Sequence, residues 1–339
     1  MLVSRGGIRY RVDKTVFRGF CALCLIVLNT QSATADWHQQ QRDMMGTRIS
    51  VELWHDKPAV ATQCGEQVFT EMRRIEAKMS TYLDSSEISH INNNAAISAV
   101  EISDEMQQIV EKSLYFSKIS EGAFDISYAS VGYAYDYRDR QQPSDDSVAS
   151  KLAAIDYRHI ELGDNRIRFK HSGVRIDLGG IAKGYAVDRA VDIVEQCGIS
   201  QAMISAGGDS RIIGDRGGRP WMIGIQHPRD PAGIALRVPL SETAVSTSGD
   251  YERFFIEAGE RVHHIIDPAT GRSAKNSWSA TVTGPNAMTT DALSTTIFIL
   301  GAAKGLALVE SLDGIDAIII DSAGKIHYSS GFEPPETEG

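Results

Sequence analysis

The sequence predicts a mixed α/β fold, or α+β in the broader sense, and two observations support this. Amphipathic helical stretches intermix with short runs of strand-forming residues, and no strict strand–helix–strand alternation runs through the chain. With 339 residues, 42% of them hydrophobic, the chain is long enough to bury a sizeable core. The net charge of −10 argues against a nucleic-acid partner, because a phosphate backbone attracts a basic protein face.

The first 35 residues have the three parts of an export signal. Basic residues between Arg5 and Arg18 precede an apolar run over residues 20–28, which is too short to span a bilayer comfortably, and Ala33-Thr34-Ala35 offers a cleavage site. We therefore predict a signal peptide over residues 1–35 and a periplasmic protein; an uncleaved anchor at the inner membrane is the alternative. Residues 36–330 are expected to form one domain of two intimate lobes, followed by a disordered acidic tail over 331–339.

Periodicity and turn residues place the elements of that domain. Apolar residues at helical spacing predict helices over residues 58–79, from 84–87 to 92–94, 103–120 (capped by Ser103), 148–155 and from 286 to 300. Alternation predicts strands over residues 47–54, 159–162, 166–170, 173–178, 202–205, 221–226, 234–239, 252–257, 261–266, 278–284 and 316–320. The polar segment 136–147 is expected to be an exposed excursion between the lobes.

Two cysteines, Cys64 and Cys197, lie in the domain. They lack metal-ligand spacing, and although a bridge between them is possible, we interpret both as buried thiols.

The segment from Asp177 to Gly184 is the strongest candidate for ligand binding. A Gly-Gly turn joins an extended segment to a helix, and glycines let an anion approach the backbone closely. The helix start offers unpaired N–H groups, and Asp177 and Lys183 add a carboxylate and an ammonium. This arrangement is typical of a phosphate-binding turn. A plain tight turn with two surface charges is the alternative, and the Gly-Gly pair alone favours it.

A second candidate is the pair Asp291 and Thr295 at the start of an apolar helix. Their spacing of four places both oxygens on one helix face, as half a site for a hard cation such as Mg²⁺. The alternative to a cation site is that Thr289, Thr290 or Asp291 caps the helix and that the Thr295 hydroxyl donates to a backbone carbonyl. The spacing alone favours this structural interpretation.

Three further segments end in glycine turns. His264 precedes the turn Asp267–Gly271 and could accept a proton near neutral pH, although a lone histidine is more often structural. The segments 205–209 and 247–250 are read as glycine turns after strands.

Taken in order, seven motifs resemble the ApbE family, the FAD:protein FMN transferases. The resemblance runs from Met45 to about Gly301. The motifs are Met79–Tyr82 with Ser86–Ile88, Gly122–Asp125, Asp177–Gly184, Gly207–Asp209, Thr247–Gly249, His264–Gly271 and Asp291–Thr295. The family commonly has Asn at the position of Ser205 and often Ala at that of Thr290, which leaves details of the ligand contacts open.

The resemblance implies an ApbE-type fold with a T-fold-like core. It also implies Mg²⁺-dependent transfer of the FMN half of FAD to a threonine hydroxyl of an acceptor protein, with release of AMP. By similarity, the metal would be held by the Gly180 carbonyl and the side chains of Asp291 and Thr295. The residues expected to line the FAD site, with Tyr82 against the flavin ring, are Met45, Tyr82, Ala123, Phe124, Asp125, Asp177, Lys183 and Ile266.

The roles within the reaction are hypotheses at this point. Asp291 would anchor the cation, and His264 would be the base for the acceptor hydroxyl, with Asp209 or a metal-bound water as rivals. Two alternatives to transfer remain: hydrolysis of FAD to FMN and AMP, and flavin binding without turnover. Family analogy predicts an acceptor with a Ser/Thr-rich flavinylation motif, in a subunit of a membrane electron-transport complex.

Overall fold

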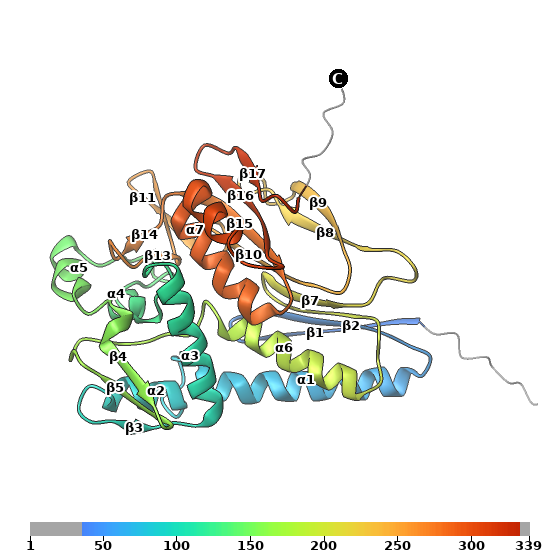
Figure 1. Ribbon diagram of the computed structural model, residues 1–339, viewed down its shortest axis with the longest axis horizontal. Helices are drawn as coiled ribbons and strands as arrows, with labels where there is room; N and C mark the ends of the chain where they lie inside the picture. The colour runs from blue at the N-terminus through green and yellow to red at the C-terminus, as the bar shows by residue number, and fades with distance from the viewer. Residues whose placement is uncertain (1–35, 333–339) are drawn as a thin grey trace, which may run out of the picture. The chain divides into compact units, whose positions relative to one another are not determined.

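An antiparallel sheet of eight strands is the centre of the fold (Figure 1). The computed structural model describes residues 36–332, so the predicted signal peptide and residues 333–339 of the acidic tail lie outside the described residues. The strands, in their order across the sheet, are β1 (Asp36–Met44), β2 (Thr47–His55), β6 (Ala202–Ala206), β7 (Asp209–Ile213), β10 (Ala244–Gly249), β15 (Ser277–Gly284), β16 (Asp316–Asp321) and β17 (Ile326–Tyr328). With the helices described next, this sheet confirms the predicted mixed α/β class.

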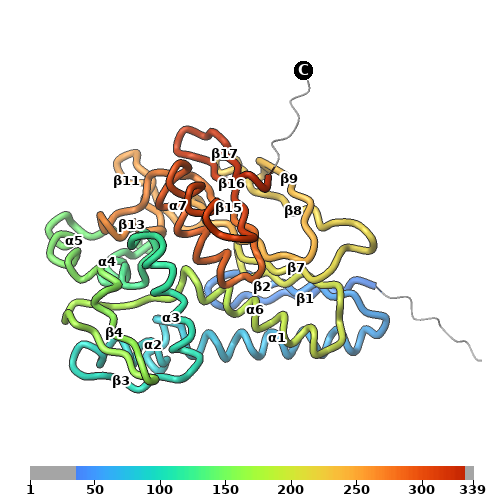
Figure 2. Tube along the Cα trace, in the orientation of Figure 1, coloured from blue at the N-terminus to red at the C-terminus, as the bar shows by residue number. Residues whose placement is uncertain are grey.

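Three long helices cover one face of this sheet, and they lie beneath and in front of it in Figures 1 and 2. They are α1 (Pro58–Met79), α6 (Ala182–Gln196) and α7 (Ala287–Val309). The strands alternate between the two faces: Ile319 of β16 lies in the core with the helices, whereas Ile318 packs against the hairpin β8 (Trp221–Gln226) and β9 (Ile234–Leu240). The helices therefore share the large hydrophobic core with one face of the sheet.

Helix α7 is apolar and long enough to cross a membrane by composition, but most of its residues are buried against β10, β15 and α6. It begins after Asn286, whose side chain accepts a hydrogen bond from the Thr289 N–H. The helix was expected to end at Leu300. A non-helical backbone at Gly301 (φ 74°) breaks it there, and a second stretch continues to Val309.

The remaining elements form smaller layers around the core. Serine side chains cap three of the helices at Ser86, Ser103 and Ser144. The helices are α2 (Glu87–Asn94), α3 (Asp104–Ile119), α4 (Ala129–Gly132) and α5 (Asp145–Leu152), with 3₁₀ turns over Ile126–Tyr128 and Tyr157–His159. The strands are β3 (Val100–Glu101), β4 (Ile160–Gly163) and β5 (Arg166–Phe169), with the pairs β11 (Phe254–Glu257)–β12 (Glu260–His263) and β13 (Ile266–Asp267)–β14 (Arg272–Ser273).

Several predictions about local structure were wrong. The strand predicted over 261–266 is divided into β12 and β13, the helix predicted over 148–155 is α5 over 145–152, and strands β7 and β17 were not predicted. Strand β1 was not predicted, because its sequence DWHQQQRDM is polar and lacks an alternation of apolar residues. It pairs with β2 and contacts α1. Residues 173–178 form no strand; the Asp177 N–H donates to the carbonyl of Ile126 instead. Residues 247–249 are not a turn but the end of β10, paired with β15.

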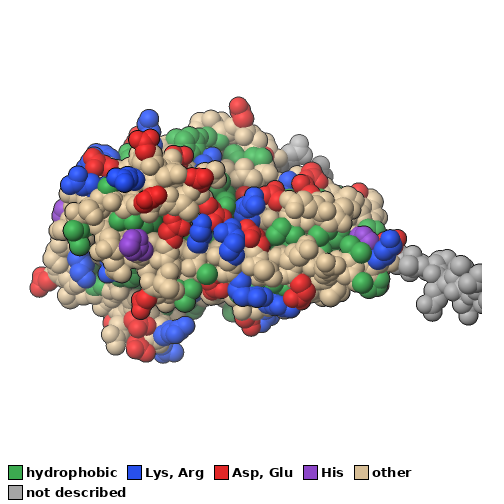
Figure 3. Space-filling model, turned by 90° about the horizontal axis from the view of Figure 1, so that it is seen from below, with side chains coloured by type: hydrophobic (Ala, Val, Ile, Leu, Met, Phe, Trp, Pro, Cys, Tyr) green, Lys and Arg blue, Asp and Glu red, His purple; other side chains and the backbone are tan. Residues whose placement is uncertain are grey.

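Acidic and basic side chains lie next to one another on the face seen from below in Figure 3. Ion pairs join α1 to its neighbours: Arg74 to Glu105 of α3, Arg42 of β1 to Glu66, and Arg189 of α6 to Glu71. Such paired, exposed charges contribute modestly to stability.

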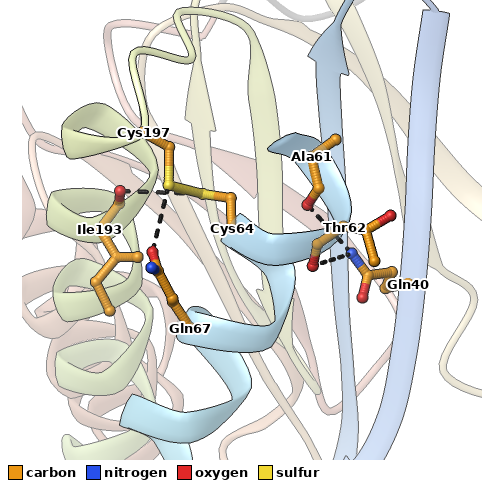
Figure 4. Close-up of a disulfide and its surroundings, with 7 residues drawn as sticks. All are labelled: Gln40, Ala61, Thr62, Cys64, Gln67, Ile193 and Cys197. Carbon is orange, nitrogen blue, oxygen red and sulfur yellow. Dashed lines mark hydrogen bonds between the residues drawn. A yellow bond between two sulfur atoms is a disulfide. The ribbon is translucent and has the colours of Figure 1, made fainter. Parts of the chain in front are cut away.

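A disulfide joins Cys64 of α1 to Cys197 at the end of α6, with Gln67 and Ile193 beside it (Figure 4). The prediction of two buried thiols was therefore wrong. Each cysteine alone matched a small hydrophobic residue, and only the packing of α1 on α6 brings their Cα atoms to 6.2 Å from each other.

Removing this bridge is expected to lower the free energy of unfolding by about 2–5 kcal/mol, because it closes a long loop and so restricts the unfolded chain. We expect the double variant Cys64→Ser/Cys197→Ser to unfold at lower urea concentration than the oxidised wild type. Reductant should shift the wild type in the same direction and leave the double variant unchanged. Equal urea midpoints for all samples would contradict the bridge.

Candidate active site

The Gly-Gly turn and the start of α7 meet in space, although more than a hundred positions separate them in the chain. A Cβ built on Gly180 would lie 3.6 Å from Thr295 Oγ1 and 3.3 Å from the ring of Phe124. The Thr295 hydroxyl also lies 3.2 Å from Ser248 Oγ of β10. The turn and the two predicted residues of α7 therefore border one site, to which β10 adds a hydroxyl.

Asp291 is buried one turn before Thr295 on α7. Its Oδ2 accepts a hydrogen bond from the Gly184 N–H (2.9 Å), at the first turn of α6. Burial and the nearby charge of Asp209 raise the pKa of the Asp291 carboxyl above its ordinary value, and the Lys183 ammonium opposes that shift. The site thus concentrates negative charge in a poorly solvated place, which favours the binding of a cation.

Lys183 lies between two carboxylates. Its Nζ is 2.9 Å from Asp209 Oδ2, 3.3 Å from each carboxylate oxygen of Asp291 and 3.1 Å from the Gly179 carbonyl oxygen. Burial lowers the pKa of Lys183, but the two carboxylates outweigh burial and keep it above its usual range. The lysine is therefore a fixed positive charge at the centre of the site.

His264 directly follows β12. Its backbone N–H donates to the carbonyl of Arg253, and its Nδ1 is buried without a hydrogen-bond partner among the described residues. Burial, followed by the neighbouring His263, Arg253 and Lys183, lowers the pKa of His264 to about 3. The imidazole is therefore neutral at pH 7 and free to accept a hydrogen bond or a proton.

Asp177 has a different set of neighbours. Its carboxylate accepts hydrogen bonds from the hydroxyls of Thr81 (2.9 Å) and Tyr128 (3.2 Å) and from the Gly179 N–H (2.6 Å). Tyr128 was not predicted from the sequence as a site residue. The only signal was its place three residues after Asp125, on the 3₁₀ turn that Asp125 caps. These contacts fix the first half of the Gly-Gly turn.

The Gly122–Asp125 motif contributes an aromatic wall and a structural carboxylate. Phe124 lies between the Gly180 turn and Phe116, and the partly buried Ala123 packs beside it on the core. Asp125 is buried and accepts hydrogen bonds from Ser127 and from the Tyr157 N–H, so its carboxylate is occupied in holding its own loop.

The other predicted residues make their contacts outside the group around Lys183. Met45 occupies the β1–β2 turn (φ 53°), where its N–H donates to Glu76 and where Arg253 binds the Gly46 carbonyl. Ile266 is buried in a separate cluster with Tyr135 and Phe255. Tyr82 is 87% exposed. The structure brings together Gly180, Lys183, Asp291 and Thr295, whereas Met45 and Ile266 contact other residues and Tyr82 is exposed.

The residues present fit a hard divalent cation. Among residues 36–332, no three His, Cys, Asp or Glu side chains converge on a metal site. The oxygens available near Gly180 are a carboxylate, a hydroxyl and backbone carbonyls, the donor types that Mg²⁺ accepts when it keeps water and substrate oxygens as its other ligands. Asp291 already forms an ion pair with the Lys183 ammonium, so its carboxylate can pair with a cation.

Comparison with known proteins identifies the family of this chain. Residues 45–319 match the ApbE family. This chain belongs to the ApbE family. Over 281 residues it is 33% identical to an FAD:protein FMN transferase of Haemophilus influenzae, covering 78% of this chain and 81% of the relative. Another FAD:protein FMN transferase, from Treponema pallidum, is 29% identical, and the match covers 92% of each chain.

Solved ApbE structures have the same fold. The ApbE protein of Thermotoga maritima superposes with a TM-score of 0.80 at 33% identity, over 88% of this chain and 98% of that one. The flavin transferase ApbE of Vibrio cholerae gives a TM-score of 0.79 at 26% identity, over 88% and 99%. The protein is a transferase with the ApbE fold, and the expectation of an enzyme is confirmed.

Proposed function

We propose that this protein is a Mg²⁺-dependent flavin transferase that moves the FMN half of FAD onto a threonine hydroxyl of an acceptor protein and releases AMP. One observation carries the proposal. Gly180, from a glycine turn suited to phosphate, adjoins Thr295 one helical turn from Asp291, and Lys183 binds the same carboxylate. This is what a diphosphate with a bound cation requires. The names of the relatives supply the substrate class.

The reaction exchanges one phosphorus–oxygen bond for another. The threonine oxygen forms a bond to the FMN phosphorus, the bond to the bridging oxygen breaks, AMP leaves with that oxygen, and the hydroxyl proton passes to a base. When bound at Asp291, Thr295 and Gly180, Mg²⁺ would draw negative charge from the diphosphate. The Lys183 ammonium adds a second positive charge, and the Gly180 turn lets the substrate approach the backbone.

Further side chains would hold the rest of FAD. Met45, Ala123, Phe124, Asp125, Asp177 and Ile266 are proposed to line its site, and the exposed ring of Tyr82 is free to cover the flavin. Asp177 already binds two hydroxyl donors, so we assign it to fixing the turn beside the substrate.

We assign the proton acceptor to His264, whose neutral ring has an unpaired nitrogen. Replacing His264 with alanine is expected to lower kcat for FMN transfer by about 10²-fold, the lower end of the range for general bases, because its low pKa makes it a weak base. Since the ring stays unprotonated well below pH 7, changing the pH from 7 to 5 should not remove this contribution. The exposed His90→Ala is the control.

Stopped-flow kinetics of transfer, with FAD affinity measured separately, checks this assignment. An unchanged transfer rate with unchanged FAD binding would contradict it, and Asp209 would become the next base to test.

We also propose that the enzyme acts in the periplasm, on a Ser/Thr-rich flavinylation motif in a subunit of a membrane electron-transport complex. The signal-like N-terminus supports export. The Cys64–Cys197 disulfide supports an oxidising compartment.

The decisive experiment is incubation with FAD, Mg²⁺ and an acceptor protein, followed by intact-mass measurement and nucleotide analysis. Acceptor mass increased by FMN minus water, with one AMP per modified acceptor, is the expected result. Free FMN with AMP and no mass gain would show hydrolysis, and intact FAD would show binding without turnover. The same incubation with EDTA should abolish transfer.

A further inference from the structure

We propose that Asp209 is a positioning residue that holds the Lys183 ammonium when a divalent cation takes Asp291. The inference depends on the proposed cation site and adds a function for a carboxylate that the proposed reaction does not use. Lys183 pairs with two buried carboxylates: Asp209 would stay paired with the ammonium, and Asp291 would bind the metal.

The backbone places Asp209 at the site with little freedom. Gly207 and Gly208 form the turn between β6 and β7; Gly207 has φ 63°, and a Cβ on Gly208 would lie 2.5 Å from the Thr247 carbonyl oxygen. The close approach of β10 therefore requires glycine and fixes the next residue, Asp209, at the start of β7. The Asp209 side chain is only 3% exposed and points at Lys183.

The Lys183 ammonium is surrounded by oxygens in this structure. An ammonium has three N–H donors, and Nζ of Lys183 lies within reach of oxygens from three places: Asp209, Asp291 and the Gly179 carbonyl. The distance to Asp209 (2.9 Å) is shorter than the two to Asp291 (3.3 Å each). Asp209 forms the closer ion pair with the lysine, whereas the Asp291 oxygens accept its longer hydrogen bonds. The attraction between opposite charges rises as their distance falls, so Asp291 is the partner that Lys183 gives up more readily.

This arrangement decides how a metal can enter. A cation that binds Asp291 competes with Lys183 for the same oxygens and brings two more positive charges close to the ammonium. With Asp209 present, the lysine keeps a carboxylate of its own, and the site holds two negative charges. Without Asp209, the lysine and the metal must share Asp291 alone. Asp209 therefore favours metal binding without touching the metal.

Two substitutions are expected to act in opposite directions on Mg²⁺ affinity, measured by calorimetry on the FAD-free protein. Asp209→Asn should weaken Mg²⁺ binding about tenfold, because Lys183 then pairs only with Asp291. Lys183→Met should tighten it, because no ammonium competes. The double variant should bind Mg²⁺ as Lys183→Met does, since Asp209 acts through the lysine. Asp192→Asn, which removes an exposed carboxylate from the same helix α6, is the control and should match the wild type.

Each outcome separates the inference from the function it depends on. Opposite shifts with a non-additive double variant support it. Wild-type affinity in Asp209→Asn, or weaker binding in Lys183→Met, would overturn it while leaving the metal site intact. If wild type and Asp291→Asn give the same Mg²⁺ heats, the cation does not bind there, and both this inference and the proposed metal site fail. Lys183→Met tests the claim independently should Asp209→Asn not fold.

Discussion

Replacing Asp291 with asparagine is expected to reduce kcat/KM for FMN transfer by at least about 10²-fold. A bound metal contributes several kcal/mol to charge stabilisation in reactions of this type, and each 1.4 kcal/mol is tenfold in rate. The neutral amide has nearly the same shape as the carboxylate and still offers an oxygen to the Gly184 N–H, but it holds a divalent cation weakly. The acceptor mass gain over time, at fixed Mg²⁺, measures the loss.

The design of this test separates chemistry from folding. Asp192→Asn also removes one carboxylate, from the surface of α6, and should transfer FMN at the wild-type rate. Raising the Mg²⁺ concentration should recover part of the activity of Asp291→Asn, because the fault is metal affinity. Wild-type turnover of Asp291→Asn at low Mg²⁺ would refute the metal site, whatever the behaviour of the control.

The local pattern of apolar, capping and proline residues predicted the long helices well, because side chains that are close in the sequence set the helix boundaries. Proline at the first turn and Ser80 after the last apolar residue mark α1 at the predicted ends, 58 and 79. Ser103 caps α3 through the Met106 N–H, as expected. The fold class followed from the same information.

The parts that local pattern missed depend on contacts between distant segments. Cys64 and Cys197 form a bridge only because α1 packs on α6, and β1 is a strand only because β2 pairs along its whole length. Tyr128 reaches Asp177 through a turn that periodicity cannot reveal. Hydrogen-bonding partners of this kind are set by tertiary packing.

The candidate site shows the same division. Spacing placed Asp291 beside Thr295 on one helix, but nothing in the local sequence placed Gly180 next to them; that expectation came from the family resemblance. The structure now gives the physical link, since the first turn of α6 packs against the first turn of α7. Gly184 is one of the residues at which the two helices touch, and it offers a direct test of that link.

Gly184→Ala is expected to impair both stability and activity. A Cβ at this position would lie 2.2 Å from the carbonyl oxygen of Ala287 and 2.8 Å from Cβ of Asp291, which is far inside contact distance. Alanine in a helix gains about 1 kcal/mol over glycine, but overpacking at a rigid backbone contact costs about 1–3 kcal/mol or more. The steric term should win, and the two helices should separate at the site.

Separation moves Asp291 away from Gly180, and a displacement of about 1 Å is enough to lower transfer by about 10²-fold. Calorimetric melting and the mass-gain assay measure the two effects on the same sample. Gly163→Ala is the matched control, because nothing lies within 4 Å of its new methyl group. If Gly184→Ala melts and transfers like the wild type, the contact between α6 and α7 does not hold the site together. If it is stable but inactive, that contact positions Asp291 without being needed for the fold.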